Sequence, residues 1–254
     1  MLLKKYKVDK LEIKIFDTRD DMGKTAGVEA ATYMKKLLSE KESISVMFGA
    51  APSQNEVLES LCNSDVDWTR VNAFHMDEYV GLSKHHPAGF RNFLNRAIFD
   101  RLPFKSIQLI NGNAENLEEE CARYEKLLKD YQLDVCMLGI GENGHIAFND
   151  PGVADFHDPV IVKVVEVDDV CRMQQVHDGC FSTLDEVPKS AITVTVPGLC
   201  AATKMYCTVP AKTKAKAVKR TLEGPIDENC PATVLRQRDD TFLYLDEDSA
   251  SLIL

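Results

Sequence analysis

The sequence lacks the features that mark membrane proteins, secreted proteins and nucleic-acid-binding proteins. Its apolar runs fall well short of a membrane span, and the charged residues 1–7 do not form the apolar segment of a signal peptide. Lys and Arg number 30 against 40 Asp and Glu, so the formal net charge is −10. This balance argues against nucleic acid and against anionic membrane surfaces as partners. We therefore expect a cytoplasmic protein that binds neither.

The cysteines and histidines show no metal-ligand or disulfide pattern. None of the eight cysteines is spaced as C-x-x-C, and several lie in apolar segments, where a thiol behaves as a small hydrophobe. We expect reduced thiols. The histidines do not show the tight His/Asp/Glu spacing of a metal site, so no metal is predicted.

Strand and helix patterns alternate almost throughout the chain, without a linker, a repeat or a low-complexity tract. This alternation predicts one α/β domain over residues 1–254, with a Rossmann-like, mostly parallel sheet and helices on both faces. Apolar and alternating runs predict strands at 11–16, 43–48, 71–76, 135–138, 160–165, 191–196, 205–209 and 241–245. Helical patterns follow at 18–39, from 54, at 87–99, at 116–131 and at 211–223.

The glycine-rich segment 139–152 follows the apolar strand 135–138 and carries His145, Asn149 and Asp150. Its first six residues fit G-x-G-x-x-G, the dinucleotide-binding pattern. That pattern must open a long helix, whereas Pro151 and Gly152 end any helix at once. We therefore predict an active-site loop with no nicotinamide or flavin, and no other cofactor.

Polar residues follow four of the predicted strands, at 49–54, 75–78, 139–150 and 210–214. Because the carboxyl ends of parallel strands lie at one edge of a sheet, these four segments should line one crevice. Asp77 and Glu78 taken alone would be ordinary turn or cap residues. Their expected convergence with His145 is what favours acid–base chemistry.

The positions of His145 and Lys214 in the sequence each allow a structural and a functional interpretation. A histidine in a glycine-rich loop is often structural, but Asn143 or Asp150 could fix the tautomer of His145 and make it an oriented base. Lys214 faces the apolar side of its helix in the first turn, where the helix dipole disfavours a cation unless an anion is bound. Ser53 opens another helix, as a cap or as a second phosphate contact. A phosphate cradle with an acid–base pair predicts proton transfer on a phosphorylated sugar.

The motifs M-D-E-Y-V-G-L at 76–82, the loop 138–151, V-P-K at 187–189 and the segment 214–224 resemble the glucosamine-6-phosphate deaminase (isomerase) family. The resemblance implies conversion of glucosamine 6-phosphate, or a close epimer such as galactosamine 6-phosphate, to a ketohexose 6-phosphate and ammonia. By position, Asp77 resembles the base that moves a proton from C2 to C1, and His145 the group that opens the sugar ring. Asn143 and Asp150 stand where the family has two supporting carboxylates.

The resemblance also implies substrate contacts and shows departures. Ser53 and Lys214 match phosphate contacts, and Ala51, Glu78 and Gly144 are expected to touch the substrate. The family has aspartate at position 143 and glutamate at position 150, and its phosphate loop reads T-G-G-T-P where this chain has A-A-P-S-Q at 50–54. Pro52 removes one backbone donor. No arginine near 179–181 matches the phosphate-binding arginine of the family, and the basic residues of the regulated members are sparse around 160–163.

Two other functions remain open at this point. A 6-phosphogluconolactonase would share the fold and the G-x-G-x-x-G-H element, and a sugar-phosphate-binding regulator that has lost catalysis would fit Asn143. The number of subunits is left open, with a homo-oligomer as one outcome.

Overall fold

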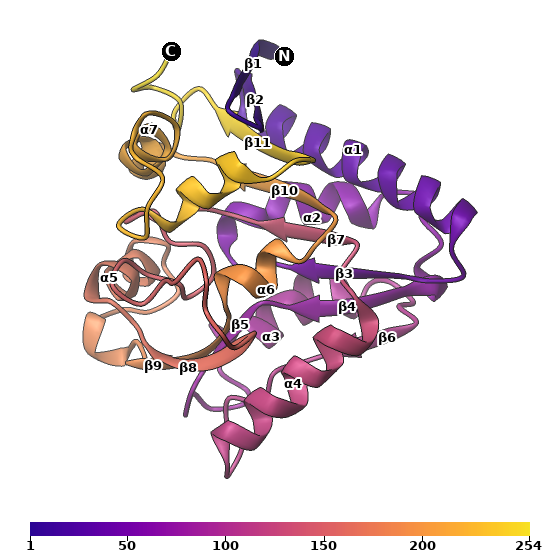
Figure 1. Cartoon of the computed structure of the whole chain (residues 1–254), viewed down its shortest axis with the longest axis vertical. Coiled ribbons are helices and arrows are strands. Elements are labelled where there is room, and N and C mark those ends of the chain that lie inside the picture. The colour runs from indigo at the N-terminus through magenta and orange to yellow at the C-terminus, as the bar shows by residue number, and fades with distance from the viewer.

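An eight-stranded sheet runs through the computed structural model, which describes all residues 1–254 (Figure 1). Its strand order is β1-β2-β11-β10-β7-β3-β4-β6, with β1 antiparallel to β2 and all other neighbours parallel. The predicted parallel sheet is confirmed. The strands are β1 (Leu2–Val8), β2 (Leu11–Phe16), β3 (Ile44–Phe48), β4 (Val71–His75), β6 (Ser106–Gln108), β7 (Val135–Leu138), β10 (Lys204–Val209) and β11 (Thr241–Asp246).

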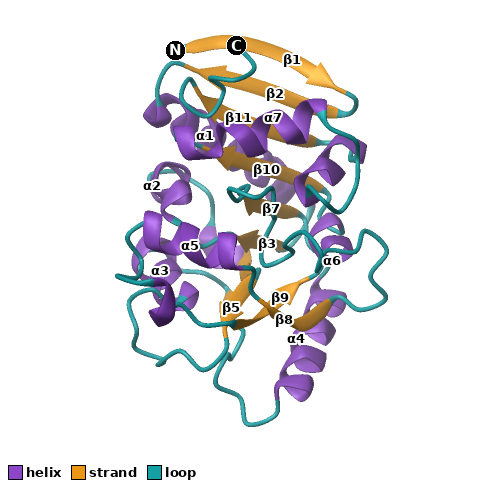
Figure 2. Cartoon of the chain, turned by 90° about the vertical axis from the view of Figure 1, so that its left-hand side faces the viewer, coloured by secondary structure: helices purple, strands orange, loops and turns teal.

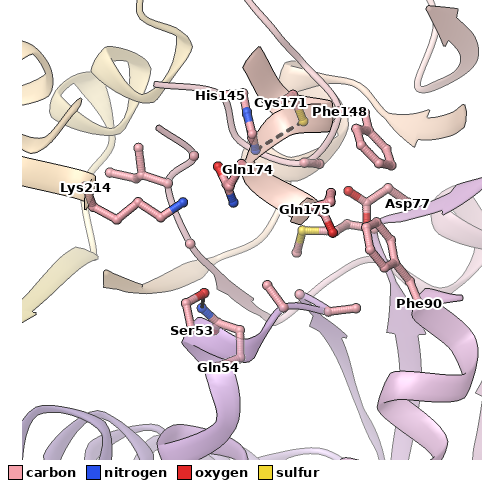
Figure 3. Close-up of a pocket in the computed structure, with 18 residues that line it drawn as sticks. Ser53, Gln54, Asp77, Phe90, His145, Phe148, Cys171, Gln174, Gln175 and Lys214 are labelled. Carbon is pink, nitrogen blue, oxygen red and sulfur yellow. Dashed lines mark hydrogen bonds between the residues drawn. The ribbon is translucent and has the colours of Figure 1, made fainter. Parts of the chain in front are cut away.

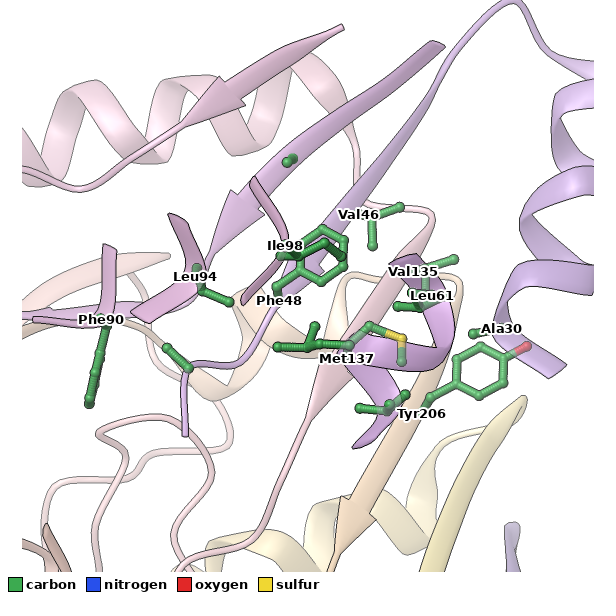
Figure 4. Packing of buried hydrophobic residues seen from close by; sticks show 14 of the residues in the cluster. Ala30, Val46, Phe48, Leu61, Phe90, Leu94, Ile98, Val135, Met137 and Tyr206 are labelled. Atoms are coloured by element: carbon green, nitrogen blue, oxygen red, sulfur yellow. The ribbon is translucent and has the colours of Figure 1, made fainter. Parts of the chain in front are cut away.

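Helices cover both faces of this sheet, as predicted. Figure 2 shows α1 (Arg19–Glu40), α2 (Asn55–Cys62) and α3 (Phe90–Leu94) along one side, with α4 (Leu117–Tyr131) and α6 (Val196–Cys200) along the other. Every residue of β3, β4 and β7 is buried, because side chains on both faces of these central strands meet helices. The first face forms a cluster that includes Val46 and Phe48 (Figure 4), while Met47 between them joins the second cluster.

A second, three-stranded sheet lies beside the main one. It contains β5 (Asp77–Tyr79), β9 (Ser190–Val194) and β8 (Val162–Glu166), all antiparallel. Two of the predicted strands, at 160–165 and 191–196, therefore exist but do not belong to the parallel sheet. The physical reason is that the chain beyond β4 continues past Met76 and pairs with β9, which places Asp77 opposite Thr193.

Several elements differ from the sequence prediction. The predicted helix 87–99 is α3 followed by a π-helical turn at Asn95–Phe99, and the predicted helix 211–223 is a 3₁₀ turn, Lys212–Lys214, followed by α7 (Ala215–Glu223). Strands β1, β5 and β6 and helices α5 (Asp169–His177) and α6 were not predicted. All eight cysteines are free thiols. None of the helices combines the length and apolar character needed to cross a bilayer.

Candidate active site

A pocket opens at the carboxyl ends of four neighbouring strands, β10, β7, β3 and β4. The chain leaves β3 for β4 and β6 on one side and returns to β7 and β10 on the other, so the pocket lies where the strand order reverses, as ligand sites do in such sheets. Its cavity volume is about 60 Å³. Its lining comprises Gly49, Ala50, Ala51, Ser53, Gln54, Met76, Asp77, Phe90, Gly139, Ile140, Gly141, His145, Ala147, Phe148, Cys171, Gln174, Gln175 and Lys214.

The loop after β7 brings His145 to the pocket without opening a helix, and the next α-helix begins only at Asp169. A Cβ atom on Gly141 would lie 2.0 Å from the imidazole Cε1 of His145, so only glycine allows the ring to pack on this backbone. Gly144 has a φ of +95°, a conformation that side chains disfavour. Both glycines therefore serve the placement of His145.

His145 is held from one side by Asn143 and Asp150. The Nδ2 of Asn143 donates to Asp150 Oδ1 at 2.9 Å, which leaves Asn143 Oδ1 facing the histidine. That oxygen accepts from the backbone N–H of His145 at 3.0 Å and lies 2.8 Å from its Nδ1, while Asp150 Oδ1 lies 3.0 Å from the same nitrogen. Since both neighbours of Nδ1 are acceptors, Nδ1 carries the proton of the neutral ring. The lone pair on Nε2 then faces the pocket.

Asp150 lies behind His145 and is completely buried. Burial works against ionisation of this carboxyl group. The charge of His145 and hydrogen bonds from His145, Asn143 and the backbone N–H of Asp168 outweigh burial and lower the pKa of Asp150. The carboxylate is therefore ionised and fully engaged, and it does not line the pocket itself.

Asp77 lies on the opposite side of the pocket from Lys214, beside the rings of Phe90 and Phe148 (Figure 3). Its residue is only 6% exposed. The carboxylate accepts no hydrogen bond from the protein, in contrast to Asp150. Burial, together with the charges of Glu78 and Asp150, raises the pKa of Asp77 well above its usual value. A carboxylate in this setting is a strong base when ionised.

Lys214 enters the pocket from the turn after β10, and Figure 3 shows its amine pointing into the space. The residue is 4% exposed, and its Nζ is buried without a hydrogen-bond partner. Burial lowers the pKa of Lys214, although the charges of Asp178 and Glu142 act in the other direction. The exposed Lys212, Lys216, Lys219 and Arg220 lie on the outer face, as the helical pattern predicted. Burial of an unpaired ammonium is unfavourable, so an anion bound next to Lys214 would stabilise it.

The loop after β3 lies next to Lys214 in the pocket lining. The hydroxyl of Ser53 accepts from the side-chain amide of Gln54 at 3.2 Å and caps no helix. Gln54 in turn bonds both the carbonyl and the hydroxyl of Thr208 in β10. This bridge ties the Ser53 loop to the strand that leads to Lys214. Ala51 also lines the pocket. Gln54 was not predicted, because a buried glutamine has no distinctive spacing.

Two residues expected to touch the substrate do not reach the pocket. Glu78 points away from it, and its carboxylate accepts hydrogen bonds from the backbone N–H groups of Phe90 at 3.1 Å and Arg91 at 2.9 Å. It therefore anchors the start of α3, and this geometry gives no support to a substrate contact. Gly144 packs against Cys230 instead, where a Cβ atom would lie 2.6 Å from the sulfur. The structure gives both residues a structural role, and their contact with a substrate stays a prediction.

Helix α5 supplies three pocket residues that the sequence did not reveal, Cys171, Gln174 and Gln175. Its inward face is mostly polar, so apolar periodicity cannot detect it. The available signal was Asp168, which accepts hydrogen bonds from the backbone of Val170 and Cys171 and so caps the helix. Gln174 fastens the helix to the His145 loop by accepting from the backbone N–H of Glu142 at 2.9 Å.

Comparison with known proteins identifies the family of the chain. The family described as glucosamine-6-phosphate isomerases/6-phosphogluconolactonase matches residues 17–244. Glucosamine-6-phosphate deaminase of Listeria welshimeri is 36% identical over 214 residues, which cover 84% of this chain and 88% of the relative. The enzyme of the same name from Lactobacillus delbrueckii is 32% identical over 228 residues, 89% of this chain and 94% of the relative.

Solved structures give the same picture of the fold. A monomeric glucosamine-6-phosphate deaminase superposes with a TM-score of 0.86 at 28% identity, covering 94% of this chain and 99% of the other. The 6-phosphogluconolactonase of Thermotoga maritima superposes with a TM-score of 0.72 at 20% identity, over 93% of this chain and 99% of its own. At that identity the second likeness concerns the fold alone.

Proposed function

Because the chain belongs to the family of glucosamine-6-phosphate isomerases and 6-phosphogluconolactonases, we propose that it is a glucosamine-6-phosphate deaminase. The enzyme converts glucosamine 6-phosphate and water to fructose 6-phosphate and ammonia. The observation that carries the proposal is one pocket that holds an unpaired buried ammonium, Lys214, together with a buried carboxylate, Asp77, and an oriented imidazole, His145. The eight free thiols fit a cytoplasmic enzyme.

Binding begins at the phosphate. Lys214 has a buried amine without a partner, and the hydroxyl of Ser53 faces the same part of the pocket. A phosphate bound here supplies the negative charge that the buried lysine lacks, and the ammonium supplies the charge-assisted hydrogen bonds that phosphate prefers. The sugar carbons then extend toward His145 and Asp77.

Ring opening is the task of His145. Its Nε2 takes the proton of the anomeric hydroxyl and returns a proton to the ring oxygen, so that the ring C–O bond breaks and an open-chain aldehyde forms. Asp150 stabilises the imidazolium that exists between these two transfers, because its carboxylate lies 3.0 Å from Nδ1. Asn143 orients the ring but adds no charge.

Asp77 carries out the isomerisation. It removes the proton from C2 and delivers it to C1, while a proton passes from the C2 amino group to the C1 oxygen, which converts the amino aldose to a ketose imine. Water hydrolyses the imine and releases ammonia. The aromatic rings of Phe90 and Phe148 keep the Asp77 carboxylate dry, and a base that is poorly solvated in its ionised form accepts a carbon-bound proton more readily.

The test is ammonia release from phosphorylated hexosamines. Glucosamine 6-phosphate and galactosamine 6-phosphate are each incubated with the purified protein, and ammonia and ketohexose 6-phosphate are measured together. We expect equal amounts of both products from one of the two sugars. Protein carrying Asp77→Asn, prepared in the same way, controls for contaminating host enzyme.

The alternative functions give different outcomes in the same assay. Hydrolysis of 6-phosphogluconolactone without ammonia release would identify a lactonase. Binding of the sugar phosphate without turnover of any substrate would identify a regulator. Either result contradicts the deaminase proposal.

A further inference from the structure

Cys171 lines the active-site pocket, yet none of the steps above uses it. Its thiol lies 3.8 Å from Nε2 of His145, the contact drawn as a dashed line in Figure 3. We propose that His145 Nε2 and Cys171 Sγ together bind a divalent ion of borderline softness such as Zn²⁺, at the position that the sugar ring must occupy.

The separation of the two atoms fits a shared ion. Zinc binds nitrogen at about 2.0–2.1 Å and sulfur at about 2.3 Å, so two such ligands at a tetrahedral angle lie about 3.6 Å apart. The observed 3.8 Å needs only a small adjustment of either side chain. Thiolate and imidazole are also the two ligand types that zinc prefers.

Asp150 completes the arrangement as a supporting group. The ligand atoms of His145, Asp150 and Cys171 all lie within 4.8 Å of one another, but the carboxylate faces Nδ1 and the thiol faces Nε2. One ion on Nε2 cannot also reach a carboxylate that is hydrogen-bonded to Nδ1. A carboxylate that accepts the second N–H of a metal-bound histidine is the usual outer partner, which fixes the ring and raises its basicity.

The surroundings of the thiol favour a cation. Burial and the charges of Asp150, Asp77 and Asp168 oppose a free thiolate, while Lys214 acts in the other direction, and together they raise the pKa of Cys171 well above its usual value. The same carboxylates attract a dication. Binding replaces the S–H bond by an S–Zn bond and releases the proton to solvent, so no oxidant or reductant is involved. The remaining coordination positions face the pocket and take water.

The ion and the sugar compete, because ring opening needs the lone pair on Nε2 that the ion occupies. Competition rests on the proposed function, whereas binding of the ion rests only on the two side chains. A direct binding experiment therefore separates the two ideas, since its result does not depend on deaminase activity.

The experiment titrates the metal-free full-length protein with Co²⁺, a spectroscopic substitute for zinc. We expect a thiolate-to-cobalt charge-transfer band that saturates at one ion per chain and disappears when Zn²⁺ is added. Cys171→Ser should lose the band, whereas Cys180→Ser, a matched change of a half-buried thiol in the neighbouring segment, should keep it. Asp150→Asn should weaken the affinity for Co²⁺ roughly 10–100-fold.

A second measurement uses only the wild-type protein, in case the variants fail to fold. Mass-spectrometric mapping of alkylation should show that Zn²⁺ protects Cys171 and leaves the labelling of Cys180 unchanged. The proposal is overturned if no band forms in the wild-type protein, if the band survives Cys171→Ser, or if Zn²⁺ leaves the alkylation of Cys171 unaltered. The 3.8 Å contact would then be a simple S–H···N hydrogen bond.

Discussion

The two ends of the pocket bury groups of opposite charge, each without a partner. At one end, Lys214 is a cation without a partner, and burial lowers its pKa. At the other end, Asp77 is a carboxyl group without a hydrogen bond, and burial raises its pKa. In both cases the protein disfavours the ionised form. The phosphate of the substrate is a fixed negative charge that neutralises Lys214, whereas the C2 amino group beside Asp77 must be in its uncharged form for the imine to develop and then offers the carboxylate no counter-charge.

The difference shows how one pocket separates binding from chemistry. The electrostatic cost at Lys214 is relieved when the ligand arrives, so it contributes to affinity. The free-energy cost of burying the ionised Asp77 remains in the complex. It is relieved only when the carboxylate takes a proton, so it increases the rate of proton transfer and not the affinity. Asp150 provides the reference, since it is also buried but is fully hydrogen-bonded and has a lowered pKa. Three substitutions test this comparison.

Asp77→Asn should have the largest effect. Loss of the base should lower kcat by roughly 10²–10⁴-fold, with little change in KM, because the amide keeps the shape of the site but cannot accept the C2 proton. Steady-state kinetics of ammonia release measures both constants. Turnover close to that of the wild type would exclude Asp77 as the base.

The same variant should gain stability at neutral pH. A raised pKa means that protonated Asp77 stabilises the folded state below the ordinary value of 3.8, and that this contribution is lost as the pH rises through the folded-state pKa. Asp77→Asn should therefore melt at a higher temperature than the wild type at pH 7, with the difference disappearing near pH 4. Asp150→Asn is the control, and should melt lower at pH 7. Identical melting curves for Asp77→Asn and wild type at pH 7 would contradict the unpaired state of this carboxyl group.

Lys214→Met should have the next largest effect, this time on binding. Removal of a charge-assisted contact to phosphate should raise KM roughly 10–100-fold. Without ligand, the variant should melt higher than the wild type at neutral pH, because the lowered pKa of the buried lysine costs stability until the pH passes the ordinary value of 10.5. Inorganic phosphate should raise the melting temperature of the wild type but not that of Lys214→Met.

Lys216→Met removes an exposed charge two residues along the chain and serves as the matched control. It should leave KM and the response to phosphate unchanged. If both lysine variants bind phosphate like the wild type, the anion site lies elsewhere in the pocket.

Asn143→Asp should have the smallest effect and tests whether position 143 influences catalysis by His145. A second carboxylate facing Nδ1 stabilises the imidazolium formed during ring opening, so kcat should change about two- to fivefold, equivalent to roughly 0.5–1 kcal/mol. The variant should also melt lower, because the donor to Asp150 is replaced by a like charge. Kinetics on both hexosamine phosphates and thermal melting measure these effects. An unaltered rate and substrate preference would show that position 143 is not coupled to His145.

The sequence was sufficient for the parts of the site that follow buried strands. Apolar runs predicted the strands, and the rule that parallel strands end at one edge predicted that Asp77, His145 and Lys214 would share a pocket. The inward position of Lys214 followed from helical periodicity alone. The roles of these residues in catalysis stay predictions until the variants are measured.

The sequence was insufficient where side chains face a polar site or where strands choose partners. Residues 162–166 and 190–194 have the alternation of strands, but alternation does not say which sheet a strand joins. Helix α5 turns Gln174 and Gln175 toward the pocket, so it lacks an apolar stripe. Glu78 follows Asp77 directly, yet adjacent residues in a strand point to opposite sides, which is why only one of them faces the substrate space.

The strand order has a consequence for the length of the substrate. The turn that carries Lys214 follows β10 and the segment that carries Asp77 follows β4, three interstrand intervals away. Each interval is about 4.8 Å and is held by backbone hydrogen bonds, so the two strands from which these segments leave are about 14 Å apart across the sheet. Side-chain substitutions can change which groups are bound at the two ends of the pocket, but the spacing of the strands is set by the backbone hydrogen bonds of the sheet.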